Sequence, residues 1–238
     1  MRDFFIGADG GGTKTRLQLE DAAGRFLADT VSGPSNIRSS IEGSWKSIMD
    51  GVQSLLSQAG LSLEDTAARF HIGLGLAGTE IQKVAEEFLR HPHPFASIVL
   101  KSDAYAACLG VHDNQDGAII IIGTGVIGYQ IEQGMVSRVG GFGFPHDDLG
   151  GGAWLGLRAT QLTLQSLDGR ISSSPFSEAI FQHFDNNESA LVAWANSAKP
   201  GDFGTLAPIV IHEANAREPL AISLMQEAAH YISLLDKA

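Results

Sequence analysis

The sequence lacks several features that would fix its class at once. A single cysteine, Cys108, stands among 238 residues, which excludes an intramolecular disulfide and a zinc site built on several cysteines. No run reaches the roughly 20 apolar residues that a membrane-spanning helix needs. The opening residues MRDFFIGADG read as the start of a strand, without the charged start and apolar stretch of a signal peptide. We therefore expect a reduced, cytoplasmic protein that does not span a membrane.

Positive charge is also scarce. Lysine and arginine total 16 against 27 for aspartate and glutamate, so the formal net charge is −11. This balance argues against a surface that follows the phosphates of a nucleic acid. An anionic ligand would need backbone N–H groups and a divalent cation to offset its charge locally.

Glycine, by contrast, is abundant and clustered. The first cluster lies in FIGADGGGTKTRLQLED, residues 5–21, where Thr13 separates Gly12 from Lys14 and so breaks the pattern of a Walker phosphate loop. The residues that follow alternate between apolar and polar, which is typical of a strand half buried on one face. The stretch therefore predicts a glycine turn between two strands.

The first half of the chain alternates predicted strands and helices. Strands are expected at 4–8, 14–20, 26–33, 69–76 and 97–101, and helices from Ile41 to near Gly60, after Thr79 to Arg90, and from Asp103 to Val111. Apolar residues spaced three and four apart from Ile41 to Leu55 indicate an amphipathic helix. Thr79 and Gln82 have the spacing of a capping box.

The strand–turn–strand pattern returns in GAIIIIGTGVIGYQIEQG, residues 117–134. Residues 123–128 match G-x-G-x-x-G, but too few residues follow before Gly134 for the helix of a dinucleotide site. After residue 152 the sequence is mostly helical. The repeat predicts two related α/β lobes, residues 1–113 and 114–238, hinged near 112–117 and offering their glycine hairpins to a shared cleft.

Two such hairpins can hold a nucleotide triphosphate, because successive backbone N–H groups in tight turns bind anions. Thr13 and Thr124 could add hydroxyl donors. Asp9, just before the first turn, could hold Mg²⁺ through water, since Mg²⁺ keeps much of its hydration shell. The alternatives are that both turns are ordinary hairpin turns and that Asp9 only forms a turn.

Asp103 lies where a predicted strand meets a predicted helix. It could cap the helix, and the positive helix end should keep its carboxylate ionised. An ionised carboxylate can accept the proton of a sugar hydroxyl during phosphoryl transfer. Asn36 in GPSN and Asp148 in GGFGFPHDD, residues 140–148, could supply further sugar contacts, although for Asn36 taken alone an ordinary loop residue is the favoured interpretation.

Taken in order, DGGGTKT, GPSN, GLGLAG, SDAYAACLG, IIGTG and GGFGFPHDDLGGGAWLG resemble the N-acetylglucosamine kinase and glucosamine kinase family. That family belongs to the BadF/BadG/BcrA/BcrD group of the sugar kinase, Hsp70 and actin superfamily. The resemblance runs from about residue 4 to the end. It implies an α/β, actin-like (ribonuclease H-like) ATPase fold with two duplicated lobes and an active-site cleft between them.

The resemblance also implies roles for individual residues. The ATP phosphates would be contacted by Asp9, Gly10, Gly11, Gly12, Thr13, Lys14, Gly123, Thr124 and Gly125, with Mg²⁺ at Asp9. The sugar would be contacted by Asn36, Asp103, Gly141, Phe142, Gly143 and Asp148. Asp103 would be the base for the 6-hydroxyl. The chain departs from the family pattern at Phe142, where a tryptophan is common, at Val126, which follows a GTG that often reads GTGS, and at Gly151, where a serine is common.

Three functions are compatible with these residues. The first is an ATP- and Mg²⁺-dependent kinase for glucosamine or N-acetylglucosamine, for which a homodimer is one assembly to test. The second is an ATPase that activates a partner enzyme, which would be expected to carry cysteines for an iron–sulfur cluster. The third is a sugar sensor without catalysis, which should lack Asp9 or Asp103. The resemblance further predicts a longer chain, with a glycine-rich adenosine-binding segment beyond residue 238.

Overall fold

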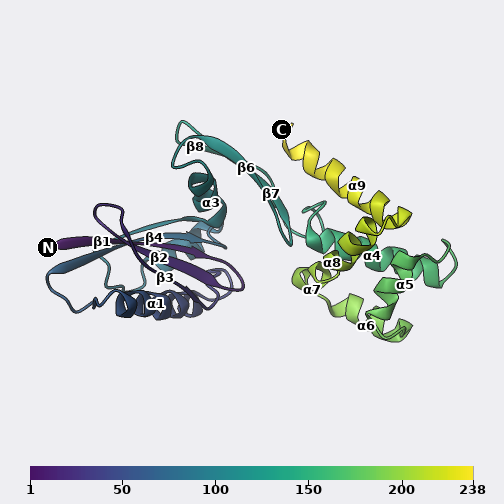
Figure 1. The fold of residues 1–238 in the computed structure, drawn as a ribbon, viewed down its shortest axis with the longest axis horizontal. Coiled ribbons are helices and arrows are strands. Elements are labelled where there is room, and N and C mark those ends of the chain that lie inside the picture. The colour runs from purple at the N-terminus through teal and green to yellow at the C-terminus, as the bar shows by residue number, and fades with distance from the viewer. Residues whose placement is uncertain (238) are drawn as a thin grey trace. The chain divides into compact units, whose positions relative to one another are not determined.

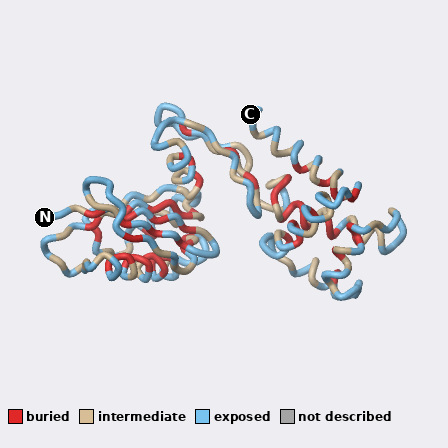
Figure 2. Tube along the Cα trace, in the orientation of Figure 1, coloured by how far each residue is buried: buried red, intermediate tan, exposed pale blue. Residues whose placement is uncertain are grey.

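The computed structural model describes residues 1–237 and shows two compact α/β units (Figure 1), which divide between Gly117 and Ala118. Each unit has its own buried core (Figure 2). Among the described residues, no helix combines the length and apolar character needed to cross a membrane.

The first unit is built on a five-stranded sheet of order β3-β2-β1-β4-β5. Its strands are β1 (Arg2–Gly10), β2 (Thr15–Asp21), β3 (Phe26–Ser32), β4 (Ala68–Leu76) and β5 (Ser97–Ser102). β1 to β3 form an antiparallel meander, whereas β4 and β5 run parallel to β1. The predicted hairpin, third strand and two later strands are thereby confirmed.

One face of this sheet is covered by helix α1 (Ile41–Gln58), which begins at the cap Ser40. Alternate residues of β1, including Phe4, Ile6 and Ala8, are buried in the core that this helix completes. The residues between them, Phe5, Gly7 and Asp9, are exposed on the opposite face. The period-two pattern of the sequence therefore decides which face carries Asp9.

Two helix starts differ from the sequence prediction. Helix α2 (Gln82–Leu89) has Ile81 at its N-cap with no side-chain cap bond, so the capping box predicted at Thr79 is wrong. Helix α3 (Asp103–Val111) is capped by Ser102, whose hydroxyl accepts from the Tyr105 N–H. Asp103 is thus the first helical residue rather than the cap.

The second unit combines a three-stranded sheet of order β6-β7-β8 with six helices among its described residues. The strands are β6 (Gly117–Ile122), β7 (Val126–Glu132) and β8 (Met135–Gly140). β8 was not predicted, because most of its residues are exposed and no alternation of apolar and polar residues marks it. The helices confirm the predicted helical second half: α4 (Gly152–Leu167), α5 (Pro175–Gln182), α6 (Glu188–Ser197), α7 (Pro200–Gly204), α8 (Ala207–Asn215) and α9 (Pro219–Leu235).

Candidate active site

The first glycine turn connects β1 to β2 and is open to solvent. The Gly11 N–H donates to the Lys14 carbonyl at 3.1 Å, which closes the turn. Within residues 1–237, no atom beyond the adjacent residues lies within 4 Å of the position a Cβ would take at Gly11 or Gly12, and Thr13 and Lys14 are exposed. A ligand can therefore approach the backbone of this turn closely.

Beneath the turn, neutral hydroxyl groups bind it to the 33–36 loop. The Thr15 hydroxyl lies 2.7 Å from the Ser35 hydroxyl and donates to the Gly33 carbonyl at 2.7 Å. The Ser35 N–H donates to the Gly11 carbonyl at 2.9 Å. A Cβ at Gly10 would overlap the Ser35 hydroxyl, so only glycine fits there. Sequence reasoning missed Ser35, although it directly precedes Asn36.

Asn36 is oriented by the backbone around it. Its Oδ1 accepts from the Arg38 N–H at 3.0 Å. A Cβ at Gly78, which has φ +90°, would lie 2.6 Å from that same oxygen. With the oxygen engaged on the protein, the amide N–H₂ is the part of Asn36 that can donate to a sugar hydroxyl.

Asp103 lies half-buried at the start of α3, and its Oδ1 accepts from the Ala104 N–H at 2.8 Å. Burial raises the pKa of its carboxyl, and the charges of Glu80 and Asp9 raise it further. The helix start alone was expected to keep this group ionised. That expectation was incomplete, because burial and two like charges outweigh the backbone hydrogen bond and move the pKa upward.

Strand topology explains why the carboxylates of Asp9, Glu80 and Asp103 lie near one another. β1, β4 and β5 are parallel, with Gly10 in register with Leu76 and Leu76 with Ser102. Their carboxyl ends therefore reach the same edge of the sheet, where ligands of open α/β sheets commonly bind. Glu80, which follows β4, was not identified from the sequence because nothing local distinguishes it from a surface glutamate.

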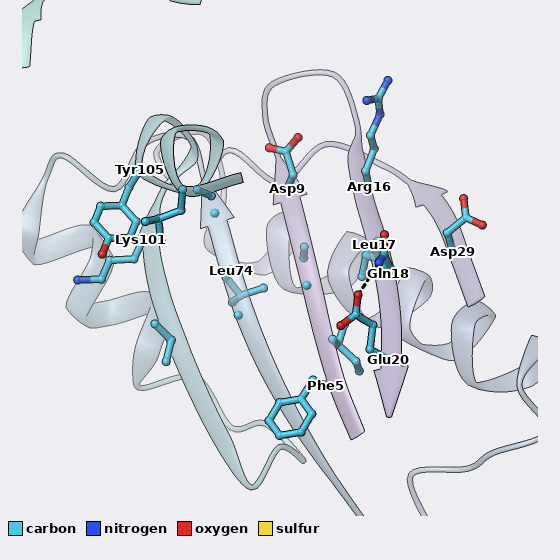
Figure 3. Close-up of a pocket in the computed structure, with 18 of the residues that line it drawn as sticks. Phe5, Asp9, Arg16, Leu17, Gln18, Glu20, Asp29, Leu74, Lys101 and Tyr105 are labelled. Atoms are coloured by element: carbon cyan, nitrogen blue, oxygen red, sulfur yellow. Dashed lines mark hydrogen bonds between the residues drawn. The ribbon is translucent and has the colours of Figure 1, made fainter. Parts of the chain in front are cut away.

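Asp9 projects from the sheet face that α1 leaves uncovered. This face lines a hollow of about 1110 Å³, and Figure 3 shows Asp9 at its end beside the glycine turn. Among the described residues, no group of three or more histidine, cysteine, aspartate or glutamate side chains is arranged to hold a metal. Mg²⁺ in phosphoryl-transfer sites usually binds one or two carboxylates plus substrate phosphates, so the exposed Asp9 carboxylate fits that requirement.

The second glycine turn, Gly123 to Gly125, connects β6 to β7 and rests on the start of α4. The Gly123 N–H donates to the Gly125 carbonyl at 2.9 Å. The first N–H groups of α4 donate to the turn, from Gly152 to the Gly123 carbonyl at 2.8 Å and from Ala153 to the Thr124 carbonyl at 2.9 Å. The helix start thus fixes the carbonyl side of the turn.

Asp148 supports the other side of this turn. Its Oδ1 accepts from the Val126 N–H at 3.1 Å, and its backbone is left-handed with φ +64°. In the same loop Gly141 and Gly143 also have positive φ, and the Asp147 Oδ2 accepts from the Phe142 N–H at 2.9 Å. The Phe142 side chain is 74% exposed and can contact a ligand directly.

The predicted site residues thus fall into one group in each unit. The first unit brings together the turn from Gly10 to Lys14 with Asp9, Asn36 and Asp103, and the second brings together Gly123, Thr124, Gly125 and Asp148, with Gly141, Phe142 and Gly143 in the adjoining loop. Each group contains a glycine turn and a polar side chain suited to a sugar.

Comparison with known proteins gives consistent relatives. Residues 6–237 match the BadF/BadG/BcrA/BcrD ATPase family. The glucosamine kinase GspK of Vibrio cholerae is 38% identical over 98% of this chain and 79% of its own length. An N-acetylmuramic acid/N-acetylglucosamine kinase of Clostridium acetobutylicum is 34% identical over 70% of this chain and 55% of its own length. A candidate N-acetylglucosamine kinase of Chromobacterium violaceum, of known structure, gives a TM-score of 0.91 at 37% identity, covering 98% of this chain and 82% of that one. This match confirms the predicted α/β fold of actin-like sugar kinases.

Proposed function

Because the chain belongs to the BadF/BadG/BcrA/BcrD ATPase family, we propose that it transfers the terminal phosphoryl group of ATP to the 6-hydroxyl of an amino sugar. The observation that carries the proposal is the half-buried Asp103, with its raised pKa, at the sheet edge that also ends in Asp9 and the open glycine turn. The kinases named among the relatives support glucosamine or N-acetylglucosamine as the sugar.

Asp103 acts as the general base. As the sugar oxygen forms its bond to the terminal phosphorus, the bond from that phosphorus to the bridging oxygen breaks and ADP leaves. The hydroxyl proton passes to the Asp103 carboxylate. A raised pKa makes this carboxylate a better proton acceptor than an ordinary aspartate, provided that it is deprotonated at the working pH.

The remaining residues position the two substrates. The Gly11 and Gly123 N–H groups are bonded within their own turns, so the remaining N–H groups of the two glycine turns bind the phosphates, together with the Thr13 and Thr124 hydroxyls. Asp9 would hold Mg²⁺ through water, and the cation would offset phosphate charge when bound. Asn36, Asp148 and the 141–143 loop contact the sugar. Most of the rate enhancement comes from this positioning, since phosphoryl transfer needs little covalent chemistry from the protein.

A coupled ADP-release assay tests the proposal. Purified protein with ATP and Mg²⁺ is given glucosamine, N-acetylglucosamine, glucose or no sugar in parallel. We expect ADP release to depend on an amino sugar, with glucose turned over at least about tenfold less efficiently, since its 2-hydroxyl would leave the protein groups that match a 2-amino or 2-acetamido group without their proper partner. ADP release at the same rate without sugar would contradict the proposal and favour an ATPase that drives a partner.

A further inference from the structure

Asp148 makes a contact that sugar binding does not require. Its Oδ1 accepts the Val126 N–H, the first donor after the second glycine turn, at 3.1 Å. Its own carbonyl accepts from the Gly151 N–H at 3.0 Å, directly before α4. The residue therefore connects the 141–148 loop to the turn through its side chain and to the helix start through its backbone.

The Asp148 carboxylate lies where a side chain at position 125 would begin. Gly125 does not have the positive φ that would demand glycine, yet a Cβ there would lie 2.7 Å from each of the three carboxyl atoms of Asp148. Any other residue at this position would push the carboxylate away from the turn. The turn and Asp148 are thus fitted to each other by close packing as well as by a hydrogen bond.

We propose that Asp148 is a positioning residue for the second glycine turn, so that sugar binding and nucleotide binding strengthen each other through one carboxylate. The inference rests on the proposed kinase function, in which the turn binds phosphate and Asp148 contacts a sugar hydroxyl. A carboxylate can accept several hydrogen bonds, so Oδ1 can hold Val126 while Oδ2 accepts from the sugar. A sugar bound to Oδ2 fixes the carboxylate, which in turn fixes the Val126 N–H and the turn.

The neighbouring aspartate shows the contrast. Asp147 accepts from the Phe142 N–H and so orders the 141–143 loop within itself, and within residues 1–237 it has no hydrogen bond to the second glycine turn. Two adjacent carboxylates therefore have different partners, one within the loop and one across to the turn. Of these two carboxylates, Asp148 is the one placed to transmit the state of the loop to the turn.

Coupling has a measurable and reciprocal consequence. Glucosamine should raise the affinity for the non-hydrolysable ATP analogue AMPPNP with Mg²⁺ by about fivefold or more, the lower end of typical coupling between two sites. AMPPNP should raise the affinity for glucosamine by the same factor. Isothermal titration of each ligand, with and without saturating amounts of the other, measures both.

Two substitutions separate the two proposed functions of the Asp148 side chain, which are holding the turn and contacting the sugar. Asp148→Gly removes the acceptor while suiting the left-handed backbone at φ +64°, whereas Asp148→Asn tolerates the same backbone and keeps an oxygen for the Val126 N–H. We expect Asp148→Gly to weaken AMPPNP binding about tenfold or more even without sugar, because a charge-assisted hydrogen bond to the turn is lost. Asp148→Asn should bind AMPPNP within about threefold of wild type while losing sugar affinity.

Asp147→Asn is the matched control, since it removes a neighbouring carboxylate charge without touching the turn. It should leave AMPPNP affinity unchanged in the absence of sugar. Equal AMPPNP affinity in wild type and Asp148→Gly, or no effect of glucosamine on AMPPNP binding in the wild type, would overturn the proposal.

Hydrogen exchange at the Val126 amide tests the contact without any ligand. NMR should show protection of this amide in wild type, Asp148→Asn and Asp147→Asn, and a loss of about tenfold or more in Asp148→Gly. If Asp148→Gly loses this protection but the wild-type protein phosphorylates no sugar, the kinase function is refuted and the positioning contact stands. If the Val126 amide is equally protected in Asp148→Gly and in a wild-type protein that is an active kinase, the positioning role alone is refuted.

Discussion

The two glycine turns look alike in sequence but are supported in different ways. The first rests on a neutral network in which Thr15, Ser35 and the Gly33 carbonyl are joined by short hydrogen bonds. The second is held by the Asp148 carboxylate and by the N–H groups that begin α4. In both, the supporting segment carries a proposed sugar contact, which is Asn36 beside Ser35 in the first unit and Asp148 itself in the second.

Because of this difference, we expect the two units to contribute differently to activity. The first unit has a buried, preformed support and adds the carboxylates of Asp9, Glu80 and Asp103 at the same sheet edge. The second unit supports its turn with the same charged side chain that is proposed to bind the ligand. We therefore expect substitutions in the first unit to change chemistry or stability, and those at Asp148 to change ligand affinity.

The largest expected effect is at Asp103. Asp103→Asn keeps the side chain's shape but removes the proposed proton acceptor, so turnover should fall by about 10²- to 10⁴-fold. Sugar affinity should change far less, and Asp148→Asn should show the opposite pattern of a raised KM with a smaller loss of kcat. Steady-state kinetics of both variants on one sugar measures these effects. Near wild-type turnover in Asp103→Asn would contradict the different functions assigned to the two units.

The next effect concerns the support of the first turn. Gly10→Ala would place a methyl group against the Ser35 hydroxyl and 2.8 Å from the Leu76 Cδ2, which should cost about 3 kcal/mol of unfolding free energy. Gly12→Ala is the control, because its Cβ would face open space. Urea denaturation of both variants measures the difference, and equal midpoints would show that the turn is not packed as described.

A smaller effect is expected when the hydroxyl network alone is broken. Thr15→Val is similar in shape but removes the donor to the Gly33 carbonyl and the partner of Ser35, both within a buried network. The loss should be about 1 to 2 kcal/mol of unfolding free energy. Thr13→Val, at an exposed position of the same turn, should unfold like the wild type. A Thr15→Val protein as stable as wild type would contradict the role of the network.

The smallest effect is a shift in pH dependence. The proposed base must be deprotonated, so we expect kcat to fall as the pH is lowered through the pKa of Asp103, which lies above its ordinary value. Glu80→Gln removes one of the charges that raise this pKa, so the acidic limb of the kcat profile should move to lower pH. Glu87→Gln on α2 is the control. A shift to higher pH in Glu80→Gln would contradict the electrostatic assignment.

Much of the first unit could be predicted because local pattern and tertiary structure agree. The alternation in TRLQLED gave β2 its buried face, and the position of Asp103 after a strand placed it at the sheet edge. Glu80 could not be predicted in the same way, because only the parallel pairing of β4 and β5 brings it near Asp103. The contact from Asp148 to Val126 depends on a left-handed backbone at Asp148. Aspartate tolerates this conformation, but its presence in the sequence does not predict it.

One measurement tests the central claim most directly, which is that phosphate is transferred from ATP to the 6-hydroxyl of an amino sugar. Protein, ATP and Mg²⁺ are incubated with ¹³C-labelled glucosamine, and the product is examined by NMR. The account predicts a single sugar phosphate in which phosphorus couples to carbon 6, and at least about 10²-fold less of it with Asp103→Asn over the same time. A phosphate on another carbon, or ADP released with the sugar unchanged, would contradict it.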